Sequence, residues 1–133
     1  MCDFSSYGGP SNKWLAIEAG LPPPVANQTV SEMTLKANQG REAIASKAMI
    51  SLSPQVHMRD HSIQTRDGYS LEARSYRPSL VPASVLLPVY IHFNGGGFVF
   101  GTLASKDAIC ASIAVSVCVV VVNVNYRHAP EFT

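Results

Sequence analysis

The amino-acid sequence predicts an α/β fold. Residues 56–76 show a two-residue apolar period around a central Asp-Gly pair, which is typical of an antiparallel β-hairpin. Residues 87–93 and 117–125 are short, nearly unbroken apolar runs, as expected for strands that are covered on both faces. The segment between these runs has a helix-like composition. The three together therefore predict a strand–helix–strand unit with parallel strands and a right-handed crossover.

Two helices are expected before the first strand. Residues 13–19 form the first, which ends at Gly20 and the proline run that follows, through Pro24. Its apolar residues are Trp14, Leu15 and Ile17. The Thr29–Glu32 stretch has the spacing of a capping box and predicts a second helix over about residues 30–48, weakened at Gly40. Residues 1–12 are rich in Ser, Gly and Pro, and we expect them to be poorly ordered.

The remaining elements follow in order along the chain. The hairpin strands are expected at residues 56–65 and 69–76, joined at Asp67-Gly68, and residues 81–86 are expected to form a loop. The helix after the second apolar run is expected to begin with Ser105 as its N-cap. Its buried face is expected to contain Ile109, Ile113 and Ala114.

Composition limits the class of protein. A chain of 133 residues fits one small domain or part of a larger one, and its net charge of +1 gives no sign of a nucleic-acid partner or an acidic membrane partner. The N-terminus lacks the basic and apolar regions of a secretory signal, and no apolar run approaches the ~20 residues that span a bilayer. We therefore expect a soluble, cytoplasmic protein. In that reducing compartment, Cys110 and Cys118 are interpreted as small buried apolar residues.

Three consecutive glycines, Gly95 to Gly97, lie at the carboxyl end of an apolar strand and just before a helix, where α/β sheets bind ligands. They fit a structural turn that needs positive φ. A dinucleotide fingerprint G-x-G-x-x-G fits poorly, because its third glycine falls on Phe100 and the next strand ends in Asn125 instead of an acidic residue. They also fit an oxyanion hole, in which backbone N–H donors contribute about 3–4 kcal/mol to the transition state of acyl transfer.

Three stretches carry a family resemblance: "HFNGGGFVFGT", "SKDAICASIA" and "VVVVNVNYRHAPE". Together they resemble the hormone-sensitive-lipase branch of the α/β-hydrolases, which has an H-G-G-G-F loop, a helix, and a D-Y-R-x-A-P-E segment after the next strand. The resemblance covers about residues 56–131. It implies a partial α/β-hydrolase, with a leader and cap-type helices in residues 1–50 and the N-terminal part of the core in residues 51–133.

The resemblance also implies a function. It suggests a carboxylic-ester hydrolase, an esterase or lipase, that acts on a small-molecule ester without a metal or an organic cofactor. Gly95, Gly96 and Gly97 correspond to the family's oxyanion hole. The residues expected to support the motif are His92, Asn94, Phe98, Tyr126, Arg127 and Glu131.

Two positions depart from the family pattern. Asn94 stands where the family has the loop histidine, and Asn125 stands where it has aspartate. Both replacements keep the shape and lose a titrating or charged group, but the glycine amides depend on neither side chain. His92 is expected to point to the same face of the strand as Asn94, where an interior structural role is the simplest interpretation.

The family's nucleophile motif is missing from these residues. G-x-S-x-G does not occur, and the nearest form, residues 9–13, lacks its second glycine and precedes all the strands. We therefore expect an N-terminal portion that supplies an oxyanion loop but no serine nucleophile, acid or histidine base, and that is inactive alone. The alternatives are a non-catalytic binding or regulatory fragment that pairs through an open sheet edge and, more weakly, a nucleotide-binding domain.

The same resemblance predicts an exposed edge. In the family, the strand that corresponds to residues 87–93 is central and has a neighbour on each side. Without its far neighbour it becomes a long apolar edge, which is a template for aggregation. We therefore expect the isolated chain to self-associate or aggregate.

Other reactive residues have simpler interpretations. His57 and His61 have the i, i+4 spacing of a helical metal pair, but on a strand they lie about 13 Å apart, too far for one zinc ion. Asp67 is explained by the turn, and His128 by a structural role in its loop. Cys110 lacks an evident basic partner and is not expected to act as a nucleophile.

Overall fold

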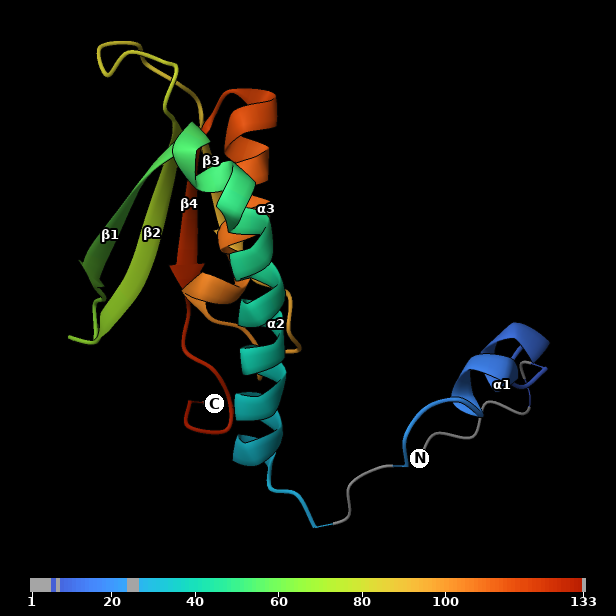
Figure 1. The fold of residues 1–133 in the computed structure, drawn as a ribbon. Helices are drawn as coiled ribbons and strands as arrows, with labels where there is room; N and C mark the ends of the chain where they lie inside the picture. The colour runs from blue at the N-terminus through green and yellow to red at the C-terminus, as the bar shows by residue number, and fades with distance from the viewer. Residues whose placement is uncertain (1–5, 7, 24–26, 133) are drawn as a thin grey trace.

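The computed structural model describes residues 6, 8–23 and 27–132 of the chain, and its α/β architecture is the one that the sequence predicts. The helices are α1 (Asn12–Glu18), α2 (Val30–Leu52) and α3 (Leu103–Val117), with a short 3-10 turn, η2 (Ser53–Gln55). The strands are β1 (Val56–Gln64), β2 (Ser70–Pro78), β3 (Val89–Phe93) and β4 (Val120–Asn125). They form one sheet in the order β1-β2-β4-β3. Figure 1 shows α2 and α3 side by side next to this sheet, while α1 stands apart.

The second helix begins at the predicted residue, and the first begins one residue before it. Ser11 caps α1, where its side chain accepts a hydrogen bond from the amide of Trp14. Thr29 and Glu32 form the predicted capping box of α2, and the bond from the Thr29 amide is the largest of the causes that lower the pKa of Glu32. The second helix continues four residues past the predicted end at residue 48, and it passes through Gly40 without interruption. Residues 1–12 were expected to be poorly ordered, and of these residues 1–5 and 7 lie outside the described part of the chain. Pro24, which was expected to help end the first helix, also lies outside it.

The hairpin is confirmed, with boundaries that differ by one or two residues from the prediction. Strands β1 and β2 are antiparallel from the Val56–Pro78 pair to the Gln64–Ser70 pair. At the turn, Gly68 has a φ of +80°, and its amide donates to the carbonyl oxygen of Thr65 at 3.1 Å. The Asp-Gly pair therefore sets the register, because the glycine adopts a conformation that other residues rarely take.

The strand–helix–strand unit is also confirmed, since β3 and β4 are parallel and α3 connects them. The start of the helix differs from the prediction. Thr102 is the N-cap, because its backbone is extended and its side chain accepts from the amide of Ser105 at 3.1 Å. The Ser105 side chain accepts from the Thr102 amide in return, so the predicted cap lies three residues inside the helix.

The buried face of α3 agrees with the prediction in part, since Ala114 is buried and Ile113 packs against the core, but Ile109 does not belong to it. It consists of Cys110, Ala111 and Ala114, whereas Ile109 is 51% exposed. These small residues pack with Val121, Tyr76 and Val56 of the sheet in the hydrophobic core. The prediction that Cys110 is buried is therefore confirmed.

Cys118, which was also predicted to be buried, is exposed. It is the C-cap of α3 and adopts a left-handed conformation with a φ of +58°, which places it at the surface where the helix turns into β4. The structure therefore contradicts the prediction for this residue.

Strand β3 contradicts the prediction of a strand covered on both faces. It is the edge of the described sheet, and Val89, Ile91 and Phe93 are 63%, 56% and 62% exposed. The helix α3 packs against β2 and β4 instead. Strand β4, in contrast, has a neighbour on each side and buries Val121. The two strands are similar in apolar composition, but among the described residues only β4 lies between two strands and beneath α3.

This edge leads to the first testable prediction. We expect the isolated 133-residue chain to self-associate as its concentration rises, because an apolar strand edge pairs readily with another one. Replacing Ile91 by lysine places a charge on that edge and is expected to reduce the association. Sedimentation velocity of both chains measures the effect. A wild-type chain that stays monomeric and melts in one cooperative transition would contradict it.

None of the helices among the described residues is long and apolar enough to cross a membrane. The proposed division of the chain at residue 50 stays a prediction. Helix α2 runs across this position and packs against α3.

Candidate functional site

The candidate site is built around the glycine loop that follows β3. The amides of Val99 and Phe100 both donate to the carbonyl oxygen of Gly96, at 3.2 and 3.0 Å, so the chain turns back on itself at this point. Gly97 and Phe98 have φ values of +60° and +62°, in the left-handed region. A Cβ atom on Gly96 would lie 1.9 Å from the carbonyl oxygen of Phe100. The turn therefore requires glycine at 96 for space and favours it at 97 for its backbone conformation.

The amides of the three glycines make no hydrogen bond within the part of the chain that the structure describes. Among the described residues, the structure gives no hydrogen-bond acceptor to the amides of Gly95, Gly96 or Gly97. They lie at the carboxyl end of β3 and ahead of the first turn of α3. Backbone N–H groups in such a place stabilise negative charge without any titrating side chain. The glycines do form the turn with positive φ that a structural role predicts, but this turn does not use their amides as hydrogen-bond donors.

Asn94 holds the two ends of the loop together. It is only 4% exposed, and its Nδ2 atom donates to the carbonyl oxygen of Phe100 at 2.8 Å. Its own carbonyl oxygen accepts from the Tyr126 hydroxyl, also at 2.8 Å. The Tyr126 ring packs edge-on against Phe98. A neutral amide at position 94 therefore closes the loop, and Tyr126 connects the loop to the chain after β4.

His92 lies on β3, two residues before Asn94. It is half-buried, and its nearest aromatic neighbour is Tyr90, with ring centroids 6.3 Å apart. Burial lowers the pKa of His92, and the nearby charge of Lys106 lowers it further. These surroundings favour the neutral imidazole.

Arg127 fastens the chain after β4 to the hairpin turn. Its Nη1 atom lies 2.6 Å from Oδ2 of Asp67, and its guanidinium lies over the rings of Tyr69 and Phe132. A hydrogen bond from Thr65, followed by the one from Arg127, lowers the pKa of Asp67 to about 2. Asp67 was assigned only to the turn, so the sequence interpretation missed its second role as the partner of Arg127.

Asn125, the other departure from the family pattern, also faces the hairpin. Its Nδ2 atom donates to Oε2 of Glu72 at 3.2 Å. An aspartate in this position would place a second negative charge beside Glu72. The amide at 125 therefore suits its neighbour in this chain.

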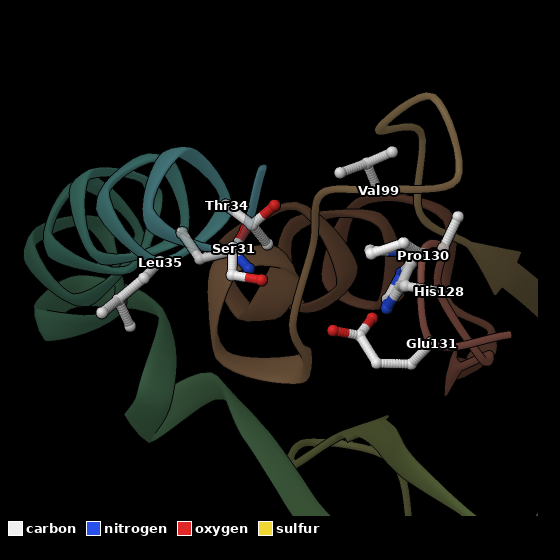
Figure 2. Close-up of a pocket in the computed structure, with 9 residues that line it drawn as sticks. Ser31, Thr34, Leu35, Val99, His128, Pro130 and Glu131 are labelled. Atoms are coloured by element: carbon white, nitrogen blue, oxygen red, sulfur yellow. The ribbon is translucent and has the colours of Figure 1, made fainter. Parts of the chain in front are cut away.

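A pocket of about 280 Å³ lies beside the glycine loop, between α2 and the chain after β4. Figure 2 shows Ser31, Thr34 and Leu35 of α2 on one side and His128, Pro130 and Glu131 on the other, with Val99 at the loop. Asn38 and Ala129 complete the lining. Burial is the larger of two opposing effects on His128 and lowers its pKa, against the charge of Glu131. The family resemblance implied cap-type helices in residues 1–50, but the individual residues of α2 that line this pocket were not predicted.

The other reactive residues lie outside this site. His57 and His61 are on β1, as the strand prediction requires, and Nε2 of His61 lies 2.8 Å from Oγ of Ser75. Within the described parts of the chain, no three His, Cys, Asp or Glu side chains are grouped to hold a metal ion. Burial raises the pKa of Cys110 to about 12, so this thiol stays protonated and is a poor nucleophile.

Comparison with known proteins finds similarity over part of the chain. Residues 89–133 match the profile of the alpha/beta hydrolase fold. The chain is 38% identical over 73 residues to ethyl acetate hydrolase from Pseudomonas putida, a match that covers 55% of this chain and 23% of that protein. Its fold is similar to that of EstE1, a thermostable carboxylesterase cloned from a metagenomic library, with a TM-score of 0.69, 29% identity, and coverage of 83% of this chain and 35% of that one.

One further relative belongs to a different class of enzyme, the oxidoreductases. The chain is 28% identical over 128 residues to the FAD-linked oxidoreductase pytB from Aspergillus terreus. This match covers 96% of this chain but only 15% of the oxidoreductase. So small a share does not indicate which part of the oxidoreductase binds FAD.

In each of these matches the chain spans well under half of the relative's length. The profile match covers the glycine loop, α3, β4 and the chain after it, and the structural match adds most of the remainder. Residues 89–133 therefore match the alpha/beta hydrolase fold, and the chain is similar to part of several esterases and carboxylesterases.

Proposed function

We propose that this chain supplies the oxyanion-binding loop of a carboxylic-ester hydrolase. The observation that carries the proposal is the glycine loop after β3, in which the amides of Gly95, Gly96 and Gly97 have no acceptor among the described residues. Ester hydrolysis passes through a tetrahedral intermediate with a negatively charged oxygen. Fixed N–H donors directed at that oxygen contribute about 3–4 kcal/mol per donor, because they need no reorganisation during the reaction.

The proposed reaction needs groups that these 133 residues do not contain. A serine attacks the ester carbonyl, a histidine takes the serine proton, and an acid orients the histidine. The sequence has no G-x-S-x-G motif, so we assign the nucleophile and its partners to polypeptide outside these residues. Gly95 and Gly96, together with Gly97, donate to the oxyanion as it forms. The loop is held by Asn94, Tyr126 and Phe98. In the segment after β4, Arg127 pairs with the hairpin turn and Glu131 lines the pocket.

The size of the neighbouring pocket indicates the substrate class. Its volume of about 280 Å³ is at the small end of ligand pockets. We therefore propose a small ester as the substrate, in agreement with the name of the Pseudomonas relative, ethyl acetate hydrolase. The lining includes Ser31, Thr34 and Glu131, so we expect a polar group of the ester on this side of the loop.

Hydrolysis of p-nitrophenyl acetate tests this function. We expect the intact protein, purified from its own cells, to hydrolyse the ester, and the 133-residue chain alone to give only the background rate. The physical reason is that an oxyanion hole has no charge to stabilise until a nucleophile attacks. An intact protein without esterase activity on p-nitrophenyl acetate or butyrate would contradict the proposal.

A second candidate function is a non-catalytic fragment that binds a partner through β3. The observation that favours it is the exposed apolar edge, where Val89, Ile91 and Phe93 are each more than half exposed. This candidate predicts that the protein in its own cells consists of the 133 residues alone and co-purifies with the partner that pairs with β3.

The nucleotide-binding alternative has weaker support. The FAD-linked relative favours it, but Phe100 occupies the position of the third glycine, and its backbone carbonyl lies against Gly96. Titration of the protein with FAD and NAD, followed by tryptophan fluorescence, tests it. We expect no binding to either cofactor.

A further inference from the structure

Helix α2 holds the glycine loop at three consecutive residues. The guanidinium of Arg41 lies over the ring of Phe100, 5.2 Å from its centroid. The amide of Gly101 donates to Oδ1 of Asn38 at 2.9 Å, and the hydroxyl of Thr102 donates to Oε1 of Glu42 at 2.6 Å.

The three contacts come from one face of α2. Asn38, Arg41 and Glu42 are spaced i, i+3 and i+4, so their side chains project from the same side of the helix. The bonded pairs are 63 and 60 residues apart in the sequence. The N-terminal segment and the loop therefore meet only in the folded chain.

The clamped residues are connected directly to the glycines. Phe100 donates its amide to the carbonyl oxygen of Gly96 and accepts the side chain of Asn94 through its own carbonyl oxygen. Gly101 is buried with a φ of +132°, and a Cβ atom there would lie 1.9 Å from Nδ2 of Asn94. A shift of Phe100 or Gly101 is therefore expected to move Gly96 and Asn94, because hydrogen bonds join Phe100 to both and the Gly101 backbone lies against the Asn94 side chain.

We propose that Asn38 and Glu42 are positioning residues for the oxyanion loop. Glu42 is not among the residues that line the proposed substrate pocket, whereas Asn38 also contributes to its lining. Asn38 fixes Gly101, Glu42 fixes Thr102 at the start of α3, and the turn between Gly96 and Phe100 passes this placement to the glycine amides. The proposal rests on the proposed function of those amides. It assigns a catalytic task to α2, a helix whose sequence carries no part of the family motif.

The test compares matched variants of the intact protein. Asn38→Leu and Glu42→Leu remove the acceptor atoms at nearly constant size, whereas Asn38→Asp and Glu42→Gln keep an acceptor oxygen in place. Gln39→Leu is the control, because it makes a similar change at an exposed position of the same helix. Two quantities are measured for each: amide hydrogen exchange of the segment 98–103, and the separate kcat and KM for p-nitrophenyl acetate.

We expect Asn38→Leu and Glu42→Leu to speed exchange of that segment about fivefold, which corresponds to the loss of one hydrogen bond of ordinary net strength. Both should lower kcat about tenfold, because a displaced oxyanion donor acts on the transition state. Glu42→Leu should also leave KM unchanged, since Glu42 does not line the pocket proposed for the ester. The acceptor-keeping variants are expected to restore both quantities, and the control to leave them at wild-type values.

Three results would overturn the proposal: unchanged exchange in both leucine variants, faster exchange with an unchanged kcat, or the same effects in Gln39→Leu. The second result would leave α2 as a purely structural support. Failure of the proposed function looks different. If the intact protein does not hydrolyse the ester at all, the proposed function fails, and the exchange measurement alone decides whether α2 holds the loop.

Discussion

Replacing Gly96 by alanine is expected to disrupt the glycine loop and to reduce ester hydrolysis by the intact protein about 10²–10³-fold, the cost of losing an oxyanion donor. The new Cβ atom would lie 1.9 Å from the carbonyl oxygen and 2.7 Å from the carbonyl carbon of Phe100. These are backbone atoms, so the turn has to open. Phe100 would then lose its bond to Gly96, and the glycine amides proposed as oxyanion donors would move from their present positions.

Two other glycines give matched controls. A Cβ atom on Gly95 meets nothing within 4 Å, so Gly95→Ala should leave hydrogen exchange of the loop as it is. Gly40 lies inside α2 and also faces open space. Gly40→Ala should leave hydrolysis unchanged and stabilise the helix by about 1 kcal/mol. A Gly96→Ala protein with wild-type activity and wild-type loop exchange would contradict the proposed role of this turn.

Replacing Asp107 by alanine is expected to cause the largest loss of stability. Asp107 lies on α3, and its carboxylate accepts two hydrogen bonds from Arg74, at 3.0 and 2.9 Å, and one from the Tyr76 hydroxyl, at 2.6 Å. The Tyr76 side chain is fully buried, and its pKa is raised, first by burial and then by Asp107. Without the carboxylate, the buried Tyr76 hydroxyl loses its acceptor, and the mostly covered Arg74 guanidinium keeps only its exposed partner, Asp60.

We expect this change to lower the free energy of unfolding by about 3 kcal/mol, near the low end for a broken buried pair, since the Arg74 and Asp107 side chains are still 21% and 15% exposed. Asp60→Ala is the control. Asp60 also pairs with Arg74, but its side chain is 66% exposed, so its loss should cost less than about 1 kcal/mol. Urea denaturation followed by circular dichroism measures both. Equal losses would show that the contact with α3 has no special weight.

The elements that the sequence predicts well depend on neighbours in the chain. The Thr29–Glu32 capping box and the Asp67-Gly68 turn are complete within four residues, and both form as predicted. The parallel pairing of β3 with β4 follows from their connection through α3, since a crossover of that length leaves few other arrangements.

The failures concern contacts between distant segments. Apolar composition alone predicted a strand covered on both faces, because it cannot tell whether a neighbouring strand is present; the edge position of β3 was predicted from the family resemblance instead, and the structure confirms it. The cap of α3 was assigned to Ser105 because both Thr102 and Ser105 suit the position, and only the extended backbone at Thr102 decides between them. Cys118 lies in an apolar stretch but occupies the left-handed position that ends the helix.

The candidate site divides in the same way. The glycine loop could be found because three adjacent glycines after a strand are rare and have few uses. The contacts of Asn38 and Glu42 with this loop could not, because two polar residues on a helix are ordinary and their partners are about 60 residues away. The bond between Arg127 and Asp67 was missed for the same reason, as its two residues are also 60 apart.

The most direct test of the account is the intact mass of the protein isolated from its own cells, after treatment with a fluorophosphonate. We expect a mass well above the 14.3 kDa of these 133 residues. We also expect a single covalent adduct on the serine of a G-x-S-x-G peptide, in a chain that contains the glycine loop of residues 95–97. A mass equal to that of the 133 residues, with no serine labelled, would contradict it and would turn attention to the partner that covers β3.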